Sequence, residues 1–570
     1  MKLLKRDYLK AIKNKKDIVV FLLVLTIISC FSLFLQKYII NGQDFMFHFS
    51  RLEGVINNIS ENTLLNGIYS NQLNGYGYAS PLFYPDIFLY FPAFLVILGI
   101  EKYSAYKIFL FVISFLSILF MYLSIKSITN DRKTGLLISI LYAASSYRLT
   151  DIFERCALGE NITFIFLPLV FWGIYEIVYR DKNKYWLLVI GMSGLILSHL
   201  ITSVLTCVVL FMICLVNIKK LFTEKDRIIK LIYAVLFTTF LTSYFIFPML
   251  EQMLEQKYAV NYMIDSFSIS DYSTRIARLF FVIPGIVYCK LFNSAWLPAG
   301  LGISFMIILF LTGRSFIKKE VINDNNFSKL IFMIGIACLF FSTNLFPWNL
   351  NIIKRVFSFM QFPWRILSLS TILILFSFAS YYRKSNCYNN QILTNSIILL
   401  AIPVILIFNV YNLSAKYLQD TLGSDVESIS FGEYLPLSDV VTGWSSEQSK
   451  YYYDREHKAV TKEDIPLKTS RKNQYLIVNY DHNEDNSEVI LPLLYYKGYD
   501  IKVNDKIVLY DKNHEGLIKV KINNEKGKIV AYYKGTRISY YTKVISLISF
   551  VFFIIIVLKK EKKFKINALY

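Results

Sequence analysis

Repeated apolar runs of bilayer-spanning length constrain this 570-residue chain more than any other feature. A helix needs about 20 predominantly apolar residues to cross the hydrocarbon core of a membrane. The sequence predicts spans at residues 18–36, 106–125, 134–147, 161–178, 185–198, 200–217, 230–249, 296–313, 327–345, 364–381, 391–410 and 543–558. A further apolar stretch, 82–99, lies between the first two of these spans. It contains prolines that break helix continuity, so we expect a re-entrant or interfacial segment there.

Lysine and arginine set the predicted orientation. They cluster in short loops beside the apolar runs and at both ends of the chain, which is typical of cytoplasmic segments and of contact with anionic lipid. This distribution argues against nucleic-acid binding, despite a net charge of +20. We therefore expect about 12 spans in a bacterial cell membrane, a multi-pass chain with both termini cytoplasmic, and a first helix that is retained rather than cleaved.

The predicted organisation has three parts. Residues 1–410 form a multi-span membrane domain with external loops 37–105, 148–160 and 250–295. Residues 411–542 are polar and rich in tyrosine, and alternation at 475–480, 499–503, 506–510, 517–522 and 528–533 predicts a small extracytoplasmic antiparallel β domain. Residues 543–570 form the final helix and a basic tail. The seven cysteines lack metal-ligand spacing, so we expect no structural disulfide or zinc site.

The first external loop carries the most informative polar cluster. Asp44, His48 and Arg51 would share one face of a helix, because their spacing is i, i+4, i+7. Ionisable groups close to a bilayer are costly unless they are solvated, paired or functional. The cluster indicates either a polar site or a solvated loop that caps a membrane helix.

The loop 148–160 carries a second cluster on the same predicted side, with Arg148, Asp151, Arg155 and Glu160. Carboxylates serve as general bases or hold a divalent cation such as Mg or Mn, and arginines grip phosphate in a bidentate fashion. The two loops could therefore form one cleft, with Asp44 and Asp151 as candidate metal ligands. The alternative is a loop closed by internal salt bridges.

Two further residues extend this site. His199 lies between two apolar runs at the predicted outer surface, where a hydrogen-bonded structural histidine is the alternative to a functional one. Arg365 begins a predicted helix, a position that disfavours a cation and favours an anionic partner such as a lipid phosphate. No Walker loop or HExxH motif is present. An external transferase would therefore need a donor already in the bilayer, and a polyprenyl-phosphate sugar meets that need.

Taken together, these motifs resemble those of GT-C type membrane glycosyltransferases. More narrowly, the chain resembles the bacterial YfhO-like family and membrane proteins described as 6-pyruvoyl-tetrahydropterin-synthase-related. The matching stretches are DFMFHFSR at 44–51, GYGYASPLFYP at 75–85, YRLTD at 147–151 with Arg155 and Gly159-Glu160, LSH at 197–199, QFPWR at 361–365, GEYLP at 432–436 and PLLYYKG at 492–498. Cys156 departs from the small residue expected at its position.

The resemblance implies an acidic residue in the first external loop as the catalytic or metal-linked group, and Asp44 matches that role. It also implies a second acidic site, for which Asp151 and Glu160 are candidates, and a task in decorating cell-surface polymers such as teichoic acids. Our hypothesis is an inverting transfer outside the membrane, from a polyprenyl-phosphate sugar to a cell-surface polymer acceptor. Asp44 would act as base and His48 would orient it, while Arg51, Arg148, Arg155, Arg365 and His199 would bind the donor phosphate. A lipid-linked sugar flippase or transporter, and a non-catalytic scaffold for envelope assembly, are the alternatives.

Overall fold

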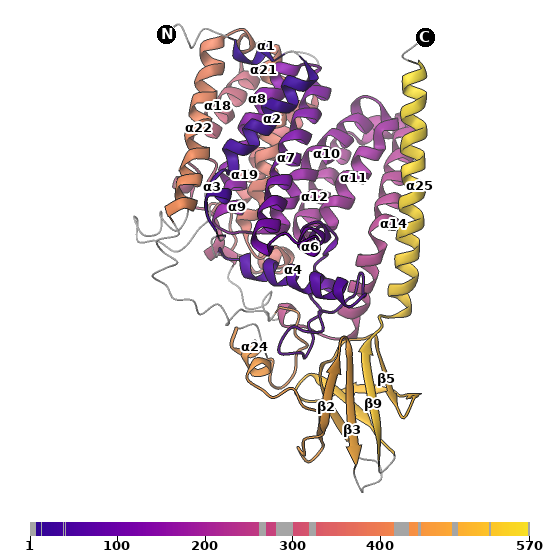
Figure 1. Cartoon of the computed structure of the whole chain (residues 1–570). Helices are drawn as coiled ribbons and strands as arrows, with labels where there is room; N and C mark the ends of the chain where they lie inside the picture. The colour runs from indigo at the N-terminus through magenta and orange to yellow at the C-terminus, as the bar shows by residue number, and fades with distance from the viewer. Residues whose placement is uncertain are drawn as a thin grey trace. The chain divides into compact units, whose positions relative to one another are not determined.

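The computed structural model describes residues 7–12, 14–37, 39, 42–261, 269–280, 300–318, 326–414, 433–442, 446–481, 488–523 and 526–567 (Figure 1). Parts of the predicted loop 250–295 and the start of the predicted span 296–313 lie outside these residues. The chain divides into two compact units. The first unit comprises residues 1–46, 101–239 and 268–424, and the second comprises 47–100, 240–267 and 425–570.

The described residues are mostly helical, and six helices among them are long and apolar enough to cross a membrane. At a rise of 1.5 Å per residue, the 28 residues of α7 extend about 42 Å, more than the roughly 30 Å of a hydrocarbon core. These six helices cover Lys102–Thr129 (α7), Leu158–Tyr179 (α10), Lys225–Glu255 (α14), Pro363–Lys384 (η6 and α21), Gln391–Ser414 (α22) and Arg537–Lys559 (within α25, Arg537–Asn567).

Shorter helices occupy the other predicted spans. They are α2 (Lys15–Cys30), α8 (Arg132–Ala143), α11 (Trp186–Ile196), α12 (Leu200–Val216), α18 (Ile303–Ile317) and α19 (Asn326–Phe341). Within the first unit α10 packs against α7 and α11, and α19 packs against α21. The remaining helices of this unit are short: α1 (Tyr8–Ala11), α3 (Ser32–Leu35), α9 (Ser146–Phe153), α13 (Ile218–Thr223), α16 (Ile276–Phe280) and α20 (Asn351–Phe357).

Local sequence explains how α7 passes into α8. The side chain of Glu101 accepts hydrogen bonds from the first backbone amides of α7, at 3.0 and 2.8 Å. Asn130 ends α7 in the left-handed conformation with φ 51°, which asparagine tolerates. Asp131 then caps α8 by accepting from the amide of Thr134 at 2.8 Å. One asparagine and one aspartate thus complete a tight helix-to-helix turn.

Helix α10 contains a proline at its centre and remains continuous. Pro168 has no N–H, so the carbonyl oxygen of Phe164 loses its helical donor. The hydroxyl of Tyr142 on α8 donates to that oxygen at 2.7 Å. Because a free carbonyl in an apolar interior is costly, this bond compensates for the proline and joins α8 to α10.

The stretch 82–99 forms short helices in the second unit. They are α5 (Ser80–Phe83), the 3-10 turn η2 (Ile87–Leu89) and α6 (Tyr90–Ile97). The apolar helical part, Ile87–Ile97, extends about 16 Å, roughly half the hydrocarbon thickness. Phe91, Phe94 and Ile97 are exposed on it.

The second unit also contains the small antiparallel β domain that the sequence predicts. In the described part of this unit nine strands form two sheets, with orders β1-β4-β8-β7 and β2-β3-β9-β5-β6. Side chains from both sheets, including Val478, Leu491, Val520 and Ile529, share one buried core, so the domain is a sandwich. The strands are β1 (Val460–Thr461), β2 (Lys468–Lys472), β3 (Tyr475–Asp481), β4 (Glu488–Leu494), β5 (Tyr499–Val503), β6 (Lys506–Ile507), β7 (Tyr510–Lys512), β8 (Leu517–Lys521) and β9 (Lys526–Tyr533).

Candidate functional site

The structure brings Asp44 to the second polar loop. The backbone amide of Asp44, just before α4 (Phe45–Ser60), donates to the carbonyl oxygen of Arg155 at 2.9 Å. Its carboxylate lies 3.8 Å from the Arg155 guanidinium. The side chain of Asp44 is 40% exposed, whereas that of Arg155 is 3% exposed. An accessible carboxylate is therefore held on a buried cation.

Gly42 permits this close approach. A Cβ at Gly42 would lie 2.5 Å from the carbonyl oxygen of Glu154 and 2.6 Å from the sulfur of Cys156. Both distances are shorter than real Cβ contacts, so any larger residue would separate the two loops. Sequence reasoning did not identify Gly42, since a single glycine before an acidic residue is a weak signal.

Arg155 is fixed by two buried carboxylates. It donates to Asp151 at 2.7 Å and to Glu160 at 2.9 Å. Asp151 lies on α9, Glu160 lies in the first turn of α10, and the turn between them bonds back to α9 through the amide of Arg155 and the carbonyl of Thr150 at 2.8 Å. The geometry thus realises the predicted internal salt bridges and, in addition, links them to Asp44.

Glu160 is the centre of the network because it also accepts from two other groups. The Nε of Arg365 donates to it at 2.9 Å, and the hydroxyl of Tyr147 donates at 2.7 Å. Arg365 further donates to the side chain of Gln361 at 2.7 Å. The anionic partner expected for Arg365 is therefore supplied by the chain itself. Tyr147 was absent from the predicted site, although it lies in a quoted motif.

Charge in this network is unevenly shared. Three carboxylates, those of Asp44, Asp151 and Glu160, meet two guanidinium groups, those of Arg155 and Arg365. Burial, and next the charge of Glu160, raise the pKa of Asp151 well above its ordinary value, against the effect of Arg155. Burial also raises the pKa of Asp44, and Arg155 opposes it. Solvent reaches 40% of the Asp44 side chain, and this contact with water favours its ionised form.

The charge of Glu160 acts on His199, but the hydrogen bonds described for the His199 ring are local ones with Thr202. It caps α12 by accepting from the amide of Thr202 at 3.3 Å, and its Nδ1 lies 2.8 Å from the Thr202 hydroxyl. Burial lowers the pKa of His199 to about 3, with Glu160 acting in the opposite direction. A neutral, hydrogen-bonded imidazole fits the structural alternative for this residue.

Arg148 is buried and makes no ion pair with a carboxylate of the described residues. It is fully buried on α9, and its one described hydrogen bond goes to the carbonyl of Ala143 at 3.3 Å. Burial lowers its pKa, and within the described residues its Nε and second terminal nitrogen have no hydrogen-bond partner. Unlike Arg155, Arg148 therefore keeps donors that no acid in the described part of the chain uses.

His48 and Arg51 belong to a separate cluster in the second unit. Arg51 donates to Asp86 at 2.5 Å, to the carbonyl of Pro85 at 2.8 Å, and lies 4.2 Å from the ring centre of Tyr84. Its terminal nitrogen is 3.0 Å from Nδ1 of His48. Asp86 was missed in the sequence, although a single acid within an apolar aromatic stretch is a usable signal for a buried partner.

The cation predicted at Asp44 and Asp151 is not supported by the donor set. Both carboxylates are directed at Arg155, a cation that already occupies the position between them. Among the described residues, no three His, Cys, Asp or Glu side chains come together as a metal site would require.

No family model matches the chain. The chain is similar to an uncharacterized protein of Lactococcus lactis subsp. cremoris (strain MG1363), with 25% identity over 257 residues. The match covers 44% of this chain and 42% of that protein, so the chain spans less than half the length of this relative.

Proposed function

We propose that this chain is a membrane glycosyltransferase that transfers a sugar from a polyprenyl-phosphate donor to a cell-surface polymer. In this proposal the 12 predicted spans, α14 and α25 among them, cross the membrane, both termini are cytoplasmic, and residues 82–99 lie at the outer interface without crossing. Support for the orientation comes from the placement of lysine and arginine in the sequence. The family resemblance of the motifs supports the class of reaction.

One observation carries the proposal: Asp44 is the accessible carboxylate of a network whose other acids are buried. In the proposed step Asp44 accepts the proton of an acceptor hydroxyl. The oxygen of that hydroxyl bonds to the anomeric carbon of the donor sugar. The bond from that carbon to the phosphate oxygen breaks, and the polyprenyl phosphate leaves with the electron pair. The sugar is transferred with inversion. A positioned general base contributes about 10²- to 10⁴-fold to such a rate.

The buried residues would act through Asp44 and the donor phosphate. Asp151 and Glu160 fix Arg155, which sets the position of Asp44, so we assign both acids a positioning role in the proposal. Arg365 donates to the same Glu160 oxygen as Arg155 and adds positive potential for the leaving phosphate. Arg148 retains unused donors suited to an anion. Arg51 pairs with Asp86 and lies beside His48, so in this proposal the two residues belong to the Asp86 cluster and take no part in the step.

The β domain offers a surface suited to a polymer acceptor. On the outer face of the β2-β3-β9-β5-β6 sheet, Tyr475 and Tyr532 pair with ring centres 4.9 Å apart, and Ile477 lies directly opposite Val530. Lysines surround this apolar strip at positions 468, 472, 502 and 528. Flat aromatic rings fit the faces of sugar rings, and the lysines would attract the phosphates of an anionic polymer.

This acceptor role is tested by binding of the purified full chain to teichoic acid. The double variant Tyr475→Ala/Lys528→Gln should bind at least several-fold more weakly than the wild type. The control is Lys462→Gln, an exposed lysine near β1 in the other sheet, which should bind normally. Equal binding by all three proteins would contradict the assignment.

The transferase itself is tested with Asp44→Asn. The purified variant should lose about 10²- to 10⁴-fold in transfer from a polyprenyl-phosphate sugar, because asparagine cannot accept the proton. The matched control is Asp226→Asn, which removes an exposed carboxylate paired with Lys182 and should keep full activity. A transporter would move the lipid-linked sugar without forming a product, and a scaffold would tolerate Asp44→Asn in cells. Full transfer activity in Asp44→Asn would refute the proposed base.

A further inference from the structure

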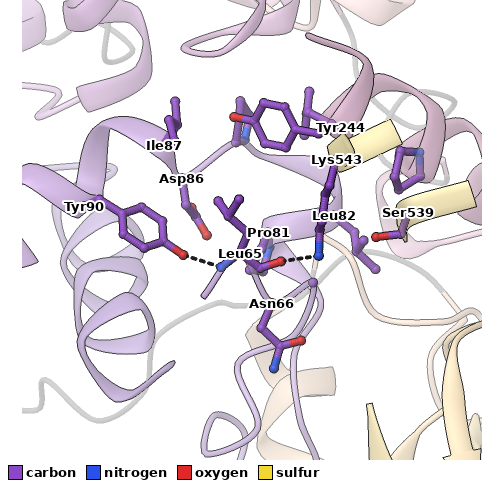
Figure 2. Close-up of a pocket in the computed structure, with 14 residues that line it drawn as sticks. Leu65, Asn66, Pro81, Leu82, Asp86, Ile87, Tyr90, Tyr244, Ser539 and Lys543 are labelled. Carbon is purple, nitrogen blue, oxygen red and sulfur yellow. Dashed lines mark hydrogen bonds between the residues drawn. The ribbon is translucent and has the colours of Figure 1, made fainter. Parts of the chain in front are cut away.

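A pocket in the second unit is formed by four segments of the chain, drawn from three regions that are far apart in sequence. It encloses about 490 Å³, part of it open to solvent, between segments 65–67, 81–90, 244–248 and 539–543. Figure 2 shows the side chains of Asp86, Tyr244 and Lys543 converging there. Two of these segments lie on α14 and α25, helices that are apolar and long enough to cross a membrane.

The two charged side chains that line the pocket differ in how they are neutralised. Asp86 is paired with Arg51 at 2.5 Å and also accepts from the hydroxyl of Tyr69. Lys543 donates to the carbonyl oxygen of Leu65 at 2.8 Å, a neutral group, and no carboxylate of the described residues lies within ion-pair distance of it. The pocket therefore presents one uncompensated positive charge.

Neutral donors accompany this charge. The hydroxyl of Tyr244 is buried and has no hydrogen-bond partner among the described residues, and the hydroxyl of Ser539 lines the same pocket. An ammonium and hydroxyl donors are the groups that bind phosphate oxygens. A lysine on a membrane helix can instead extend its ammonium to water. Lys543 does not, because its ammonium is directed to the Leu65 carbonyl in the pocket wall.

Apolar side chains lead away from the pocket along the helices that build it. Tyr540, Val544 and Leu547 are exposed on α25, and Phe247 and Leu250 are exposed on α14. Such surfaces are matched by hydrocarbon chains when the helices lie in a bilayer. A ligand that fits both parts has an anionic phosphate and an apolar tail.

We propose that this pocket binds the headgroup of an anionic membrane phospholipid, such as phosphatidylglycerol. The phosphate pairs with Lys543, the hydroxyls of Tyr244 and Ser539 donate to its oxygens, and the acyl chains follow the exposed faces of α14 and α25. This inference does not depend on the proposed transferase, because none of its residues takes part in the step assigned to Asp44.

The test measures lipid retention by the full chain in nanodiscs of mixed phosphatidylglycerol and phosphatidylcholine. Native mass spectrometry should show selective retention of phosphatidylglycerol by the wild type. Lys543→Gln should reduce that retention about tenfold or more, and Tyr244→Phe, a milder change that keeps the ring, should reduce it about 2- to 10-fold through one lost hydrogen bond.

Lys559→Gln, which neutralises an exposed lysine of the same helix, is the control for general charge attraction and should retain lipid as the wild type does. Inorganic phosphate in millimolar excess should not displace the lipid, since it lacks the tail. Equal retention by Lys543→Gln and wild type would overturn the proposal. So would displacement by inorganic phosphate, which would identify a site for soluble anions, or equal retention of phosphatidylcholine.

Discussion

Replacing Glu160 with glutamine tests whether the buried network holds the site together. Glu160 accepts from Arg155 and Arg365, both at 2.9 Å, and from Tyr147 at 2.7 Å. Glutamine keeps one acceptor oxygen but presents an NH₂ group to donors and removes the charge between two guanidinium groups. Breaking a buried ion pair on one side costs about 3–5 kcal/mol, because the remaining charges stay buried.

Hydrogen exchange in the purified protein measures this cost locally. The amides that join α9 to α10, including those of Arg155, Ala157 and Asn161, are protected by backbone bonds of 2.8–3.0 Å. A loss of 3 kcal/mol or more should speed their exchange by at least about 100-fold, since every 1.4 kcal/mol is a factor of ten.

The matched control is Glu224→Gln. Glu224 pairs with Arg227 at 2.8 Å, but its side chain is 43% exposed. A solvent-exposed pair contributes about 0–1 kcal/mol, so this variant should alter exchange in its own segment by no more than about fivefold. If Glu160→Gln and Glu224→Gln had equally small effects, the buried network would not be what orders the loop.

Three further predictions follow from single contacts. Gly42→Ala should fold but lose transfer activity at least tenfold, because the added Cβ would push the Asp44 loop away from Cys156. The control Gly313→Ala, whose Cβ would make only ordinary contacts, should be active. Full activity of Gly42→Ala would contradict this reasoning. Tyr142→Phe should lower the free energy of unfolding by about 1–3 kcal/mol, because the carbonyl of Phe164 loses its hydrogen-bond donor. The loss should be much smaller in a Pro168→Ala background, where a backbone N–H is restored. Equal losses in the two backgrounds, measured by thermal unfolding, would refute the reasoning. His199 is neutral in the fold with a pKa of about 3 and protonates near pH 6.5 when unfolded, so stability should fall as the pH drops below about 6.5, by up to about 1.4 kcal/mol per pH unit. In His199→Asn, which keeps a capping side chain, melting at pH 7 and pH 5 should show a smaller loss, and an unchanged loss would exclude His199 as the titrating group.

Periodicity and apolar length predicted much of the fold. Helices occupy the predicted spans in the described residues, and alternation located five β segments, because a buried face leaves a regular pattern in the sequence. The prediction was wrong in detail at 506–510, where β6 and β7 are separate strands in different sheets. Strand β2 was missed because an edge strand of sequence KTSRK has no apolar alternation, and β4 was missed because its apolar run contains Pro492.

The site was predictable in its residue types but not in its pairings. Separate clusters of acids and arginines indicated where charge would gather, and Asp44 does meet Arg155. The partner of Arg365 is Glu160, 205 residues away, and the partner of Arg51 is Asp86. Such pairings depend on which helices pack together, and no local pattern encodes them. Gly42 shows the same limit, since its importance appears only against the backbone of another loop.

The distance in sequence between Glu160 and Arg365 has a consequence for biosynthesis. A nascent chain that has been translated only through α10 already contains Glu160, Arg155 and Tyr147, but it lacks the second guanidinium. Until Pro363–Lys384 has been made, Arg155 is the one guanidinium of this pair that can bond to Glu160. Closure of the charged centre therefore belongs to the late stages of synthesis, after most of the first unit has been made.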